Sequence, residues 1–370
     1  MPHNFTSVWR ALVVAACAAS PAWAANPPAG LDLTGKVPLK SAGPLAFGPE
    51  GVLFVGDPLS ARVFAIGVEP ADRKSAASPV KVEAVNDQLA ALVGIKSQEL
   101  LINDIAVQPH SSAVYLSASR GAGPDAEPIL AKISPAGKLS LVELDKAAYS
   151  KVELSNAPGA DQVDRRGNKT RLESITDLQF VDGRLFVAGL SNEEFASKLR
   201  AISFPFASAD QGTSVEIYHG AHGQFETRAP VRTFVPFDVN GEAHLMAAYT
   251  CTPLVSFPLS KLKAGEKLRG TTVAELGNRN RPIDIIAYEK DGHKYLLLAN
   301  NARGVMKIAT DTIAQQESLS SPVKETAGLT YDTLKELKGV EQLDKLGETH
   351  ALLLVKAEDG TMNLETIALP

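Results

Sequence analysis

The chain carries a short pattern of apolar runs and tight turns that returns at intervals along most of its length. Each copy has an apolar run, a turn, a second apolar run, a polar loop and a third apolar run. The first two runs of successive copies occupy residues 45–55, 104–116, 177–187, 231–247 and 284–298. Repeats spaced by tens of residues indicate a solenoid, a propeller or an array. Because every repeated unit reads as strands, the pattern predicts a propeller.

The spacing of the copies predicts how many blades the propeller has. The second strands centre near Phe54, Tyr115, Phe186, Met246, Leu296 and Leu353, which are 50 to 71 residues apart. This predicts an all-β fold of six four-stranded antiparallel blades, and a ring of seven is the less favoured alternative. The sixth copy is the weakest, because its innermost strand is unclear and residues 332–346 read as an amphipathic helix.

Turn residues and two inserted segments complete the expected organisation. Asp182-Gly183, Asn240-Gly241 and Asp291-Gly292 supply the positive φ that tight hairpins demand. Residues 86–101 carry leucines at a spacing that predicts a short helix before the second blade. Residues 147–173 are polar and lack apolar periodicity, so they form either a lid or a mobile loop, and the loop is favoured.

The N-terminal residues indicate export. Residues 1–24 have a basic start, an apolar stretch and a small-residue cleavage site before Ala25, as a signal peptide does. A lipoprotein processed at Cys17 is the less favoured alternative. No other long apolar stretch follows, so we expect no membrane span and a single propeller domain over residues 25–370, in the periplasm or secreted.

The composition of the mature chain excludes several classes of partner and fold. Removing residues 1–24 leaves 36 Lys and Arg against 42 Asp and Glu, a net charge of −6. This balance lacks the excess of basic residues that binding to nucleic acid or an anionic membrane requires. Both tryptophans fall in residues 1–24, which excludes Trp-Asp repeats and tryptophan-docked quinoprotein propellers. Cys251 is then the sole thiol, so no internal disulfide forms.

Acidic residues recur at one position of the repeat. Asp104, Asp177 and Asp284 each open an innermost strand, and Asn103 lies beside the first of them. Their side chains are expected to point toward the central channel, where they would bind one Ca²⁺ ion. The alternative is that each aspartate accepts backbone N–H groups and holds neighbouring blades together. Leu45 occupies the corresponding position of the first blade.

The blade motif over residues 40–369 resembles the six-bladed propellers of the broad group that contains NHL-repeat, senescence-marker-30/gluconolactonase, strictosidine-synthase-like and paraoxonase-like proteins. Lactonases and esterases of these families hold a metal with Asn, Asp and Glu. The resemblance therefore implies a metal site at the aspartates and, as one alternative, a metal-dependent hydrolase. A likeness at the level of fold assigns no reaction by itself.

A second group of candidates lies on the loops that join the strands on one rim. His219 and His222 fall in the loop that enters the fourth blade, and Cys251 follows that blade's second strand. Two imidazoles and a thiolate are ligands for copper or zinc, and they also suit Cys-His nucleophilic chemistry. A buried, inert cysteine is the alternative. Glu226 and Arg228 lie on the same loop and are predicted to bind ligand.

A third group of candidates consists of arginine and asparagine residues. Arg279, Arg281, Asn301 and Arg303 lie on two neighbouring loops of the same rim. Guanidinium groups bind carboxylate or phosphate with paired hydrogen bonds, so this group predicts an anion site. The alternative is solvation of the loops and hydrogen bonding between blades.

Together these features predict an exported, monomeric propeller that binds a small polar or anionic ligand on its loop rim, with Ca²⁺ or a transition metal as the implied cofactor. A metal-dependent lactonase or esterase is one alternative. The other is a scaffold that docks a second periplasmic protein.

Overall fold

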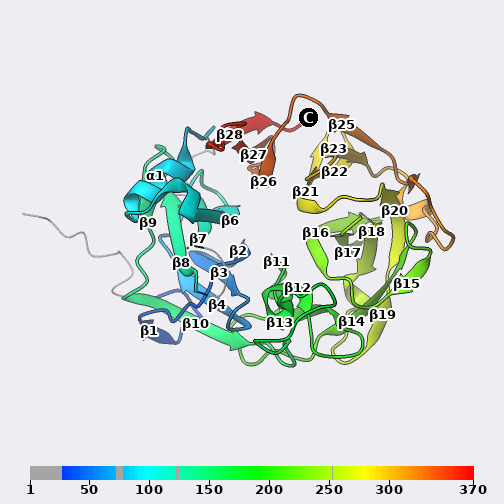
Figure 1. The fold of residues 1–370 in the computed structure, drawn as a ribbon, viewed down its shortest axis with the longest axis horizontal. Helices are drawn as coiled ribbons and strands as arrows, with labels where there is room; N and C mark the ends of the chain where they lie inside the picture. The colour runs from blue at the N-terminus through cyan, green and yellow to red at the C-terminus, as the bar shows by residue number, and fades with distance from the viewer. Residues whose placement is uncertain (1–26, 72–77, 122–124, 252) are drawn as a thin grey trace, which may run out of the picture.

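The computed structural model describes residues 27–370 apart from 72–77, 122–124 and 252. The strands form six sheets arranged radially around a central channel (Figure 1). The predicted six-bladed β-propeller is therefore confirmed, and the described residues contain no seventh sheet. None of the described helices is long and apolar enough to cross a bilayer. The predicted signal peptide and Cys17 lie outside the described residues.

We number the blades by the chain order of their innermost strands and give the strands from the channel outward. Blade 1 contains β2 (Leu45–Phe47), β3 (Val52–Asp57), β4 (Arg62–Gly67), β10 (Ala147–Glu153) and β1 (Leu33–Gly35). Blade 2 contains β6 (Leu100–Val107), β7 (Val114–Arg120), β8 (Glu127–Ile133) and β9 (Leu139–Leu141). Blade 3 contains β11 (Asp177–Val181), β12 (Arg184–Leu190), β13 (Ser197–Ser203), β14 (Thr213–His219) and β15 (Gln224–Glu226), with β19 (Lys267–Arg269) parallel to β14.

The remaining three blades complete the ring. Blade 4 contains β16 (Val231–Val239), β17 (Glu242–Tyr249), β18 (Pro253–Pro258), β20 (Thr271–Leu276) and β24 (Thr326–Gly328). Blade 5 contains β21 (Pro282–Lys290), β22 (His293–Asn300), β23 (Gly304–Ala309) and β25 (Tyr331–Leu334). Blade 6 contains β26 (Val340–Leu346), β27 (His350–Lys356), β28 (Met362–Ala368) and β5 (Lys81–Val82). The helices are α1 (Val85–Leu92) and the 3₁₀ turns η2 (Ser97–Glu99), η3 (Thr170–Glu173), η4 (Leu259–Lys261) and η5 (Ile313–Gln315).

The blades do not follow one another around the ring in chain order. Blade 1 lies between blades 2 and 3, because its buried residues pack on blade 2 on one side and on blade 3 on the other. Blade 2 packs in turn against blade 6. Two strands cross between blades to make this order possible: β5 forms the outer strand of blade 6, and β10 returns to the outside of β4 (Figure 1).

The crossing strand β10 corrects one prediction. Residues 147–173 were expected to be a lid or a mobile loop, yet residues 147–153 form a strand that pairs with β4 over five residues. Its backbone groups find partners on the exposed edge of blade 1, and Ala147 and Val152 are buried there. This tertiary pairing outweighs the polar local sequence. Residues 154–169 remain loop, followed by η3.

A second correction concerns residues 332–346. The predicted helix is wrong, because the segment forms β25 and β26 joined by a turn. The buried residues of β26 are Val340, Leu343 and Leu346. A bulge between Val340 and Gln342 keeps Val340 and Leu343 on the face toward blade 5, while Leu346 lies on the other face and packs toward blade 2. Apolar residues three apart imitate one face of a helix. The short helix expected within residues 86–101 is confirmed as α1.

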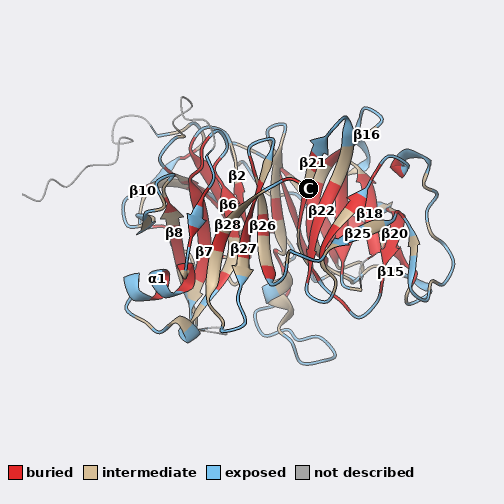
Figure 2. Ribbon diagram, turned by 90° about the horizontal axis from the view of Figure 1, so that it is seen from above, coloured by how far each residue is buried: buried red, intermediate tan, exposed pale blue. Residues whose placement is uncertain are grey.

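The core is divided among the interfaces between blades. Each of the six hydrophobic clusters joins two neighbouring sheets, and no cluster belongs to one blade alone. Figure 2 shows buried strand centres between two rims of exposed turns. Burial of apolar surface between blades, at about 25 cal/mol per Å², therefore stabilises the ring as a closed unit.

The predicted hairpin turns lie on one rim. Asp182, Asn240 and Asp291 have φ of 48°, 51° and 53°, and each is followed by a glycine that also has positive φ. The opposite rim carries the loops that enter the innermost strands and those that join the second and third strands. We call this second rim the loop face.

Candidate functional site

A tight hairpin at the outer edge of blade 3 brings two histidines and a glutamate together. β14 ends at His219, the chain turns through Gly220 and Gly223, and β15 pairs back so that His219 opposes Gln224 and Ile217 opposes Glu226. The N–H of Gly223, which has a φ of +65°, donates to the His219 carbonyl at 2.8 Å. The turn therefore places His222 beside His219.

Glu226 bonds both imidazoles. Its Oε2 lies 2.9 Å from Nδ1 of His219, and its Oε1 lies 2.6 Å from Nδ1 of His222. The ring centroids are 3.9 Å apart. With Nδ1 of each ring engaged by the carboxylate, Nε2 is the nitrogen left for another partner. Nε2 of His219 is buried and has no hydrogen-bond partner among the described residues.

Cys251 joins this pair from blade 4. A ring nitrogen of His219, a ring nitrogen of His222 and Sγ of Cys251 all lie within 4.8 Å of one another. Cys251 has a left-handed φ of 63°, and its N–H donates to the Asn280 carbonyl at 2.8 Å. We call His219, His222 and Cys251 the His/Cys cluster. The three residues that the sequence analysis grouped are thus brought together.

Two carboxylates flank the His/Cys cluster. Burial acts against the ionised form of Glu226, but the hydrogen bonds from His219 and His222 outweigh it and lower the pKa of this carboxyl to about 2. Glu275 of β20 accepts the Gly220 N–H beneath the turn, and burial raises the pKa of its carboxyl. A Cβ on Gly220 would lie 2.9 Å from Cγ of Glu275, so the close packing requires glycine there. Sequence reasoning missed Glu275, because it reaches the turn from another blade.

The three predicted aspartates lie in the central channel, and each spans two blades. Each uses one carboxylate oxygen for the N–H of the next residue and the other for an N–H of the neighbouring innermost strand: Asp104 with Leu45 at 2.7 Å, Asp177 with Phe234 at 2.7 Å and Asp284 with Leu343 at 3.1 Å. Asp344 of β26 does the same with Val107 at 2.7 Å. We call these four residues the aspartate ring.

The aspartate ring lines a channel cavity of about 260 Å³. Burial, together with the neighbouring carboxylates, raises the pKa of Asp104 and Asp284 well above the ordinary value. Burial likewise raises the pKa of Asp177 to about 7 and that of Asp344 to about 6. The ring members do not form a close group of metal ligands, since the His/Cys cluster is the one such group among the described residues. Asn103 donates to the Ala42 carbonyl instead.

Asp344 was missed from the sequence because its segment was read as helix. The bond pattern supports the alternative in which the aspartates hold blades together, and the Ca²⁺ hypothesis stays a prediction.

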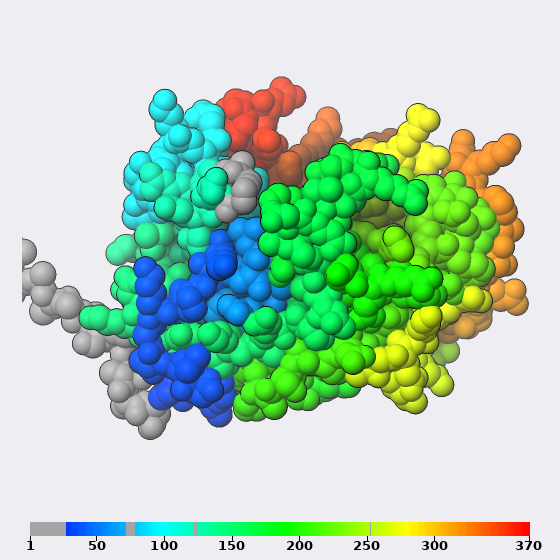
Figure 3. Space-filling model, turned by 60° about the horizontal axis from the view of Figure 1, so that its bottom comes forward, coloured from blue at the N-terminus to red at the C-terminus, as the bar shows by residue number. Residues whose placement is uncertain are grey.

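A larger cavity of about 850 Å³ opens at the mouth of the channel on the loop face. We call it the mouth pocket. The segments that enter the innermost strands of blades 1 to 5 line it, and η3 contributes Leu172 and Glu173. Figure 3 shows that a green segment of the chain projects from this side of the molecule and that the surface next to it is hollowed.

The charges in the mouth pocket are not balanced. Glu173 pairs with Arg232 at 2.7 Å, and Arg232 also donates to Oγ1 of Thr250 at 3.1 Å. The guanidinium of Arg281 forms no hydrogen bond or ion pair within the described part of the chain, although its backbone N–H donates to Oδ1 of Asn301. Burial and the neighbouring charge of Arg232 lower the pKa of Arg281.

The other predicted ligand residues lie apart from this pocket. Arg303 donates to the Asn278 carbonyl and packs against Gly277. Arg228 donates to the Glu194 carbonyl, and Arg279 has a φ of 55° in the turn before Arg281. Of the predicted anion-binding group, Arg281 alone lines the mouth pocket. The ligand-binding roles of the others stay predictions.

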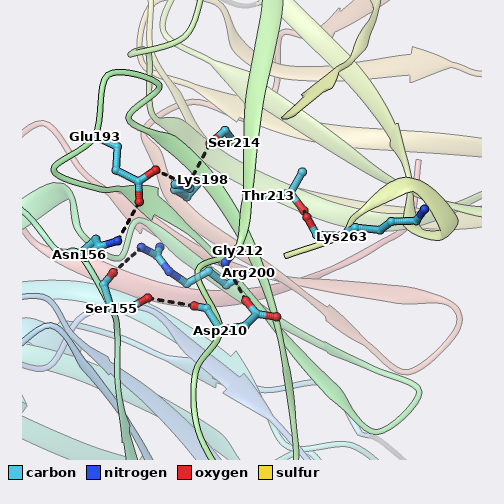
Figure 4. Close-up of polar contacts among 10 residues, drawn as sticks. All are labelled: Ser155, Asn156, Glu193, Lys198, Arg200, Asp210, Gly212, Thr213, Ser214 and Lys263. Carbon is cyan, nitrogen blue, oxygen red and sulfur yellow. Dashed lines mark hydrogen bonds and ion pairs between the residues drawn. The ribbon is translucent and has the colours of Figure 1, made fainter. Parts of the chain in front are cut away.

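A buried pair of cations on β13 was also missed by the sequence analysis. Lys198 and Arg200 are 2% and 0% exposed. Lys198 pairs with Glu193 at 2.7 Å and bonds Ser214, while Arg200 donates to the Ser155 carbonyl at 3.2 Å (Figure 4). The Arg200 bond ties the loop after β10 to blade 3, and Glu193, which pairs with Lys198, accepts from Asn156 of the same loop at 3.0 Å.

Comparison with known proteins finds distant structural neighbours. No family model matches the chain, and no curated protein matches it in sequence. Among solved structures it is similar to a Thermus thermophilus protein provisionally assigned as an oxidoreductase (glucose dehydrogenase), with 12% identity, 90% of this chain and 99% of that one covered, and a TM-score of 0.37. It is also similar to the PQQ-bound aldose sugar dehydrogenase of Streptomyces coelicolor, with 11% identity, 90% and 97% covered, and a TM-score of 0.35.

A Lactobacillus plantarum protein shows 14% identity over 89% of this chain and 85% of its own, with a TM-score of 0.35. No activity is taken from likenesses this distant. The propeller fold is confirmed by the six radial sheets themselves, while the NHL and gluconolactonase group stays a resemblance.

Proposed function

We propose that this chain is an exported propeller that binds a small organic anion in the mouth pocket through Arg281. The observation that carries the proposal is a guanidinium that lines a large cavity and forms no hydrogen bond or ion pair among the described residues, since the nearby Glu173 pairs with Arg232.

The size and walls of the mouth pocket suit such a ligand. A volume of about 850 Å³ falls in the range of about 300–1,000 Å³ that is usual for small-molecule sites. Leu101 and Leu172 line the cavity and are 54% and 48% exposed, so they leave apolar surface for the body of a ligand. The favoured ligand is therefore a carboxylate with an apolar portion.

The electrostatics of the pocket favour an anion. Arg232 and Arg281 both face the cavity, and Glu173 pairs with one of them only. Lys169 adds a third cation at the rim, where it pairs with Asp161 at 3.2 Å. An incoming carboxylate would accept paired hydrogen bonds from Arg281 and reduce the repulsion between the two guanidinium groups.

A panel of monocarboxylates from butyrate to benzoate, each matched with its uncharged amide, tests this proposal by calorimetry. We expect at least one acid to bind saturably and its amide not to bind. Arg281→Ala should weaken binding about 10- to 100-fold, because one charge-assisted bond contributes about 1.5–3 kcal/mol.

Arg279→Ala is the matched control, since Arg279 lies in the same turn and outside the pocket, and it should bind as the unchanged protein does. Equal affinity in Arg281→Ala, or no binding by any acid of the panel, contradicts the proposal.

Export is part of the proposal and rests on residues 1–24. The mass of the protein recovered from a periplasmic fraction should correspond to a chain that begins at Ala25. The hydrolase alternative receives no specific support, because the aspartates it needs are engaged by backbone N–H groups.

A further inference from the structure

We propose that the His/Cys cluster is a transition-metal site for Zn²⁺ or copper, formed between blades 3 and 4 by His219, His222 and Cys251, with Glu226 positioning both imidazoles. This site is separate from the mouth pocket and does not depend on an organic anion.

The donor atoms are already close together. One nitrogen of each histidine and Sγ of Cys251 lie within 4.8 Å of one another, so small side-chain movements bring all three to one ion. His219 is 2% exposed and its Nε2 has no partner among the described residues. A buried polar atom without a partner destabilises the folded protein, and coordination would supply the missing partner.

Glu226 supplies the outer support that metal-binding histidines usually have. Imidazoles that ligate metals generally donate the other ring N–H to a carboxylate, which fixes the ring orientation and tautomer. Here one carboxylate does this for two rings, at 2.9 Å and 2.6 Å. The arrangement leaves Nε2 of both rings as the ligating nitrogens.

The donor set selects the kind of ion. Thiolate and imidazole ligands favour zinc and copper, whereas Ca²⁺ and Mg²⁺ take oxygen ligands. The carboxyls of Glu226 and Glu275 lie beside the cluster, where Glu226 bonds both imidazoles and Glu275 accepts the Gly220 N–H.

The site has an open side. His222 is exposed and Cys251 is half-buried, so the ion would lie at the surface with three protein ligands. Zinc sites with three protein ligands keep a fourth position for water or another molecule. The cluster is thus suited to an ion that remains accessible from solvent.

The sole thiol of residues 25–370 makes the test specific. Untagged protein with the signal peptide removed is stripped with a chelator and titrated with Co²⁺ and, separately, with Cu²⁺ and Zn²⁺. We expect one ion per chain and a thiolate-to-metal charge-transfer band with Co²⁺ or Cu²⁺, since that band requires Cys251. Competition between Zn²⁺ and copper then shows which ion the site prefers.

Single substitutions distinguish the proposed metal ligands from Glu226, which positions them. Cys251→Ser should abolish the charge-transfer band, and His222→Ala should weaken binding more than tenfold. Glu226→Gln should keep the band and lower the affinity about 10- to 100-fold. His293→Ala is the control, because His293 is exposed, pairs with Asp311 and lies outside the cluster.

Circular dichroism confirms that each variant is folded. The proposal is overturned if the unchanged protein shows no charge-transfer band with either ion, or if Cys251→Ser binds metal as tightly as the unchanged protein.

Discussion

The aspartate ring and the His/Cys cluster both consist of residue types that can bind a metal, but their lone pairs have different partners. In the ring both oxygens of each carboxylate accept a backbone N–H, and one of the two bonds joins neighbouring blades. In the cluster Glu226 engages Nδ1 of each histidine, and Nε2 of His219 has no partner in the described part of the chain. Residue types that can bind a metal therefore indicate a metal site only where their ligand atoms have no other partner.

The largest expected effect is the pH dependence of the free energy of unfolding, which should come from the aspartate ring and not from the His/Cys cluster. The raised pKa values of Asp177, about 7, and Asp344, about 6, mean that the folded state binds protons more tightly than the unfolded chain. Their stabilising contribution is complete below about pH 4 and is lost as pH rises through 6 and 7. At about 1.4 kcal/mol per pKa unit, these two carboxyls together should lower the free energy of unfolding by on the order of 6 kcal/mol between pH 4 and pH 8.

Urea titrations across this pH range measure that slope. Asp177→Asn should make the slope shallower, because one of the raised carboxyls is removed, whereas Glu226→Gln should leave the slope unchanged. A stability that rises with pH over the same interval would contradict the raised pKa values.

Removing one member of the ring should lower the free energy of unfolding by a similar amount. Asp177→Ala leaves the N–H groups of Leu178 and Phe234 without their acceptor, so we expect a loss of about 2–5 kcal/mol at pH 5. Urea unfolding at that pH checks it, and Asp32→Ala, at an exposed position, serves as the control. A loss below about 0.5 kcal/mol would show that the ring does not hold the blades.

Metal should stabilise the protein through the cluster and not through the ring. At 100 times its dissociation constant, Zn²⁺ should raise the free energy of unfolding by about 2.7 kcal/mol. The increase should vanish in Cys251→Ser and persist in Asp177→Asn when thermal unfolding is followed with and without the ion. If the increase persisted in Cys251→Ser and vanished in Asp177→Asn, the metal would bind in the channel instead.

The smallest effect is expected from a cluster ligand in the metal-free protein. His222 is exposed, so His222→Ala should change the free energy of unfolding by about 0.5 kcal/mol or less without metal. Denaturant unfolding of the chelated protein measures this. A loss above about 2 kcal/mol would mean that the cluster is primarily structural.

The sequence predicted the blades well because the repeat of apolar runs is local. It predicted the membership of the His/Cys cluster because the rule for which loops share a rim follows from blade topology. It did not predict β10 as an outer strand of blade 1, since that pairing depends on an edge supplied far away in the chain. Asp344 was missed because the apolar residues of its segment stand three positions apart on two faces of β26, which resembles a helical period.

Glu275 and Arg232 show a further limit of sequence reading. Both are ordinary charged residues on strands, and nothing in their local pattern marks them. Their importance comes from contacts across blades: Glu275 with the turn at Gly220, and Arg232 with Glu173. Only the folded ring brings these partners together.

The most direct measurement is an anomalous difference map from crystals of the protein grown with Zn²⁺, recorded on both sides of the zinc absorption edge. We expect one strong peak between His219, His222 and Cys251 and none between the four aspartates of the channel. A peak in the channel, or an empty His/Cys cluster at saturating Zn²⁺, would contradict the division of roles between these two regions.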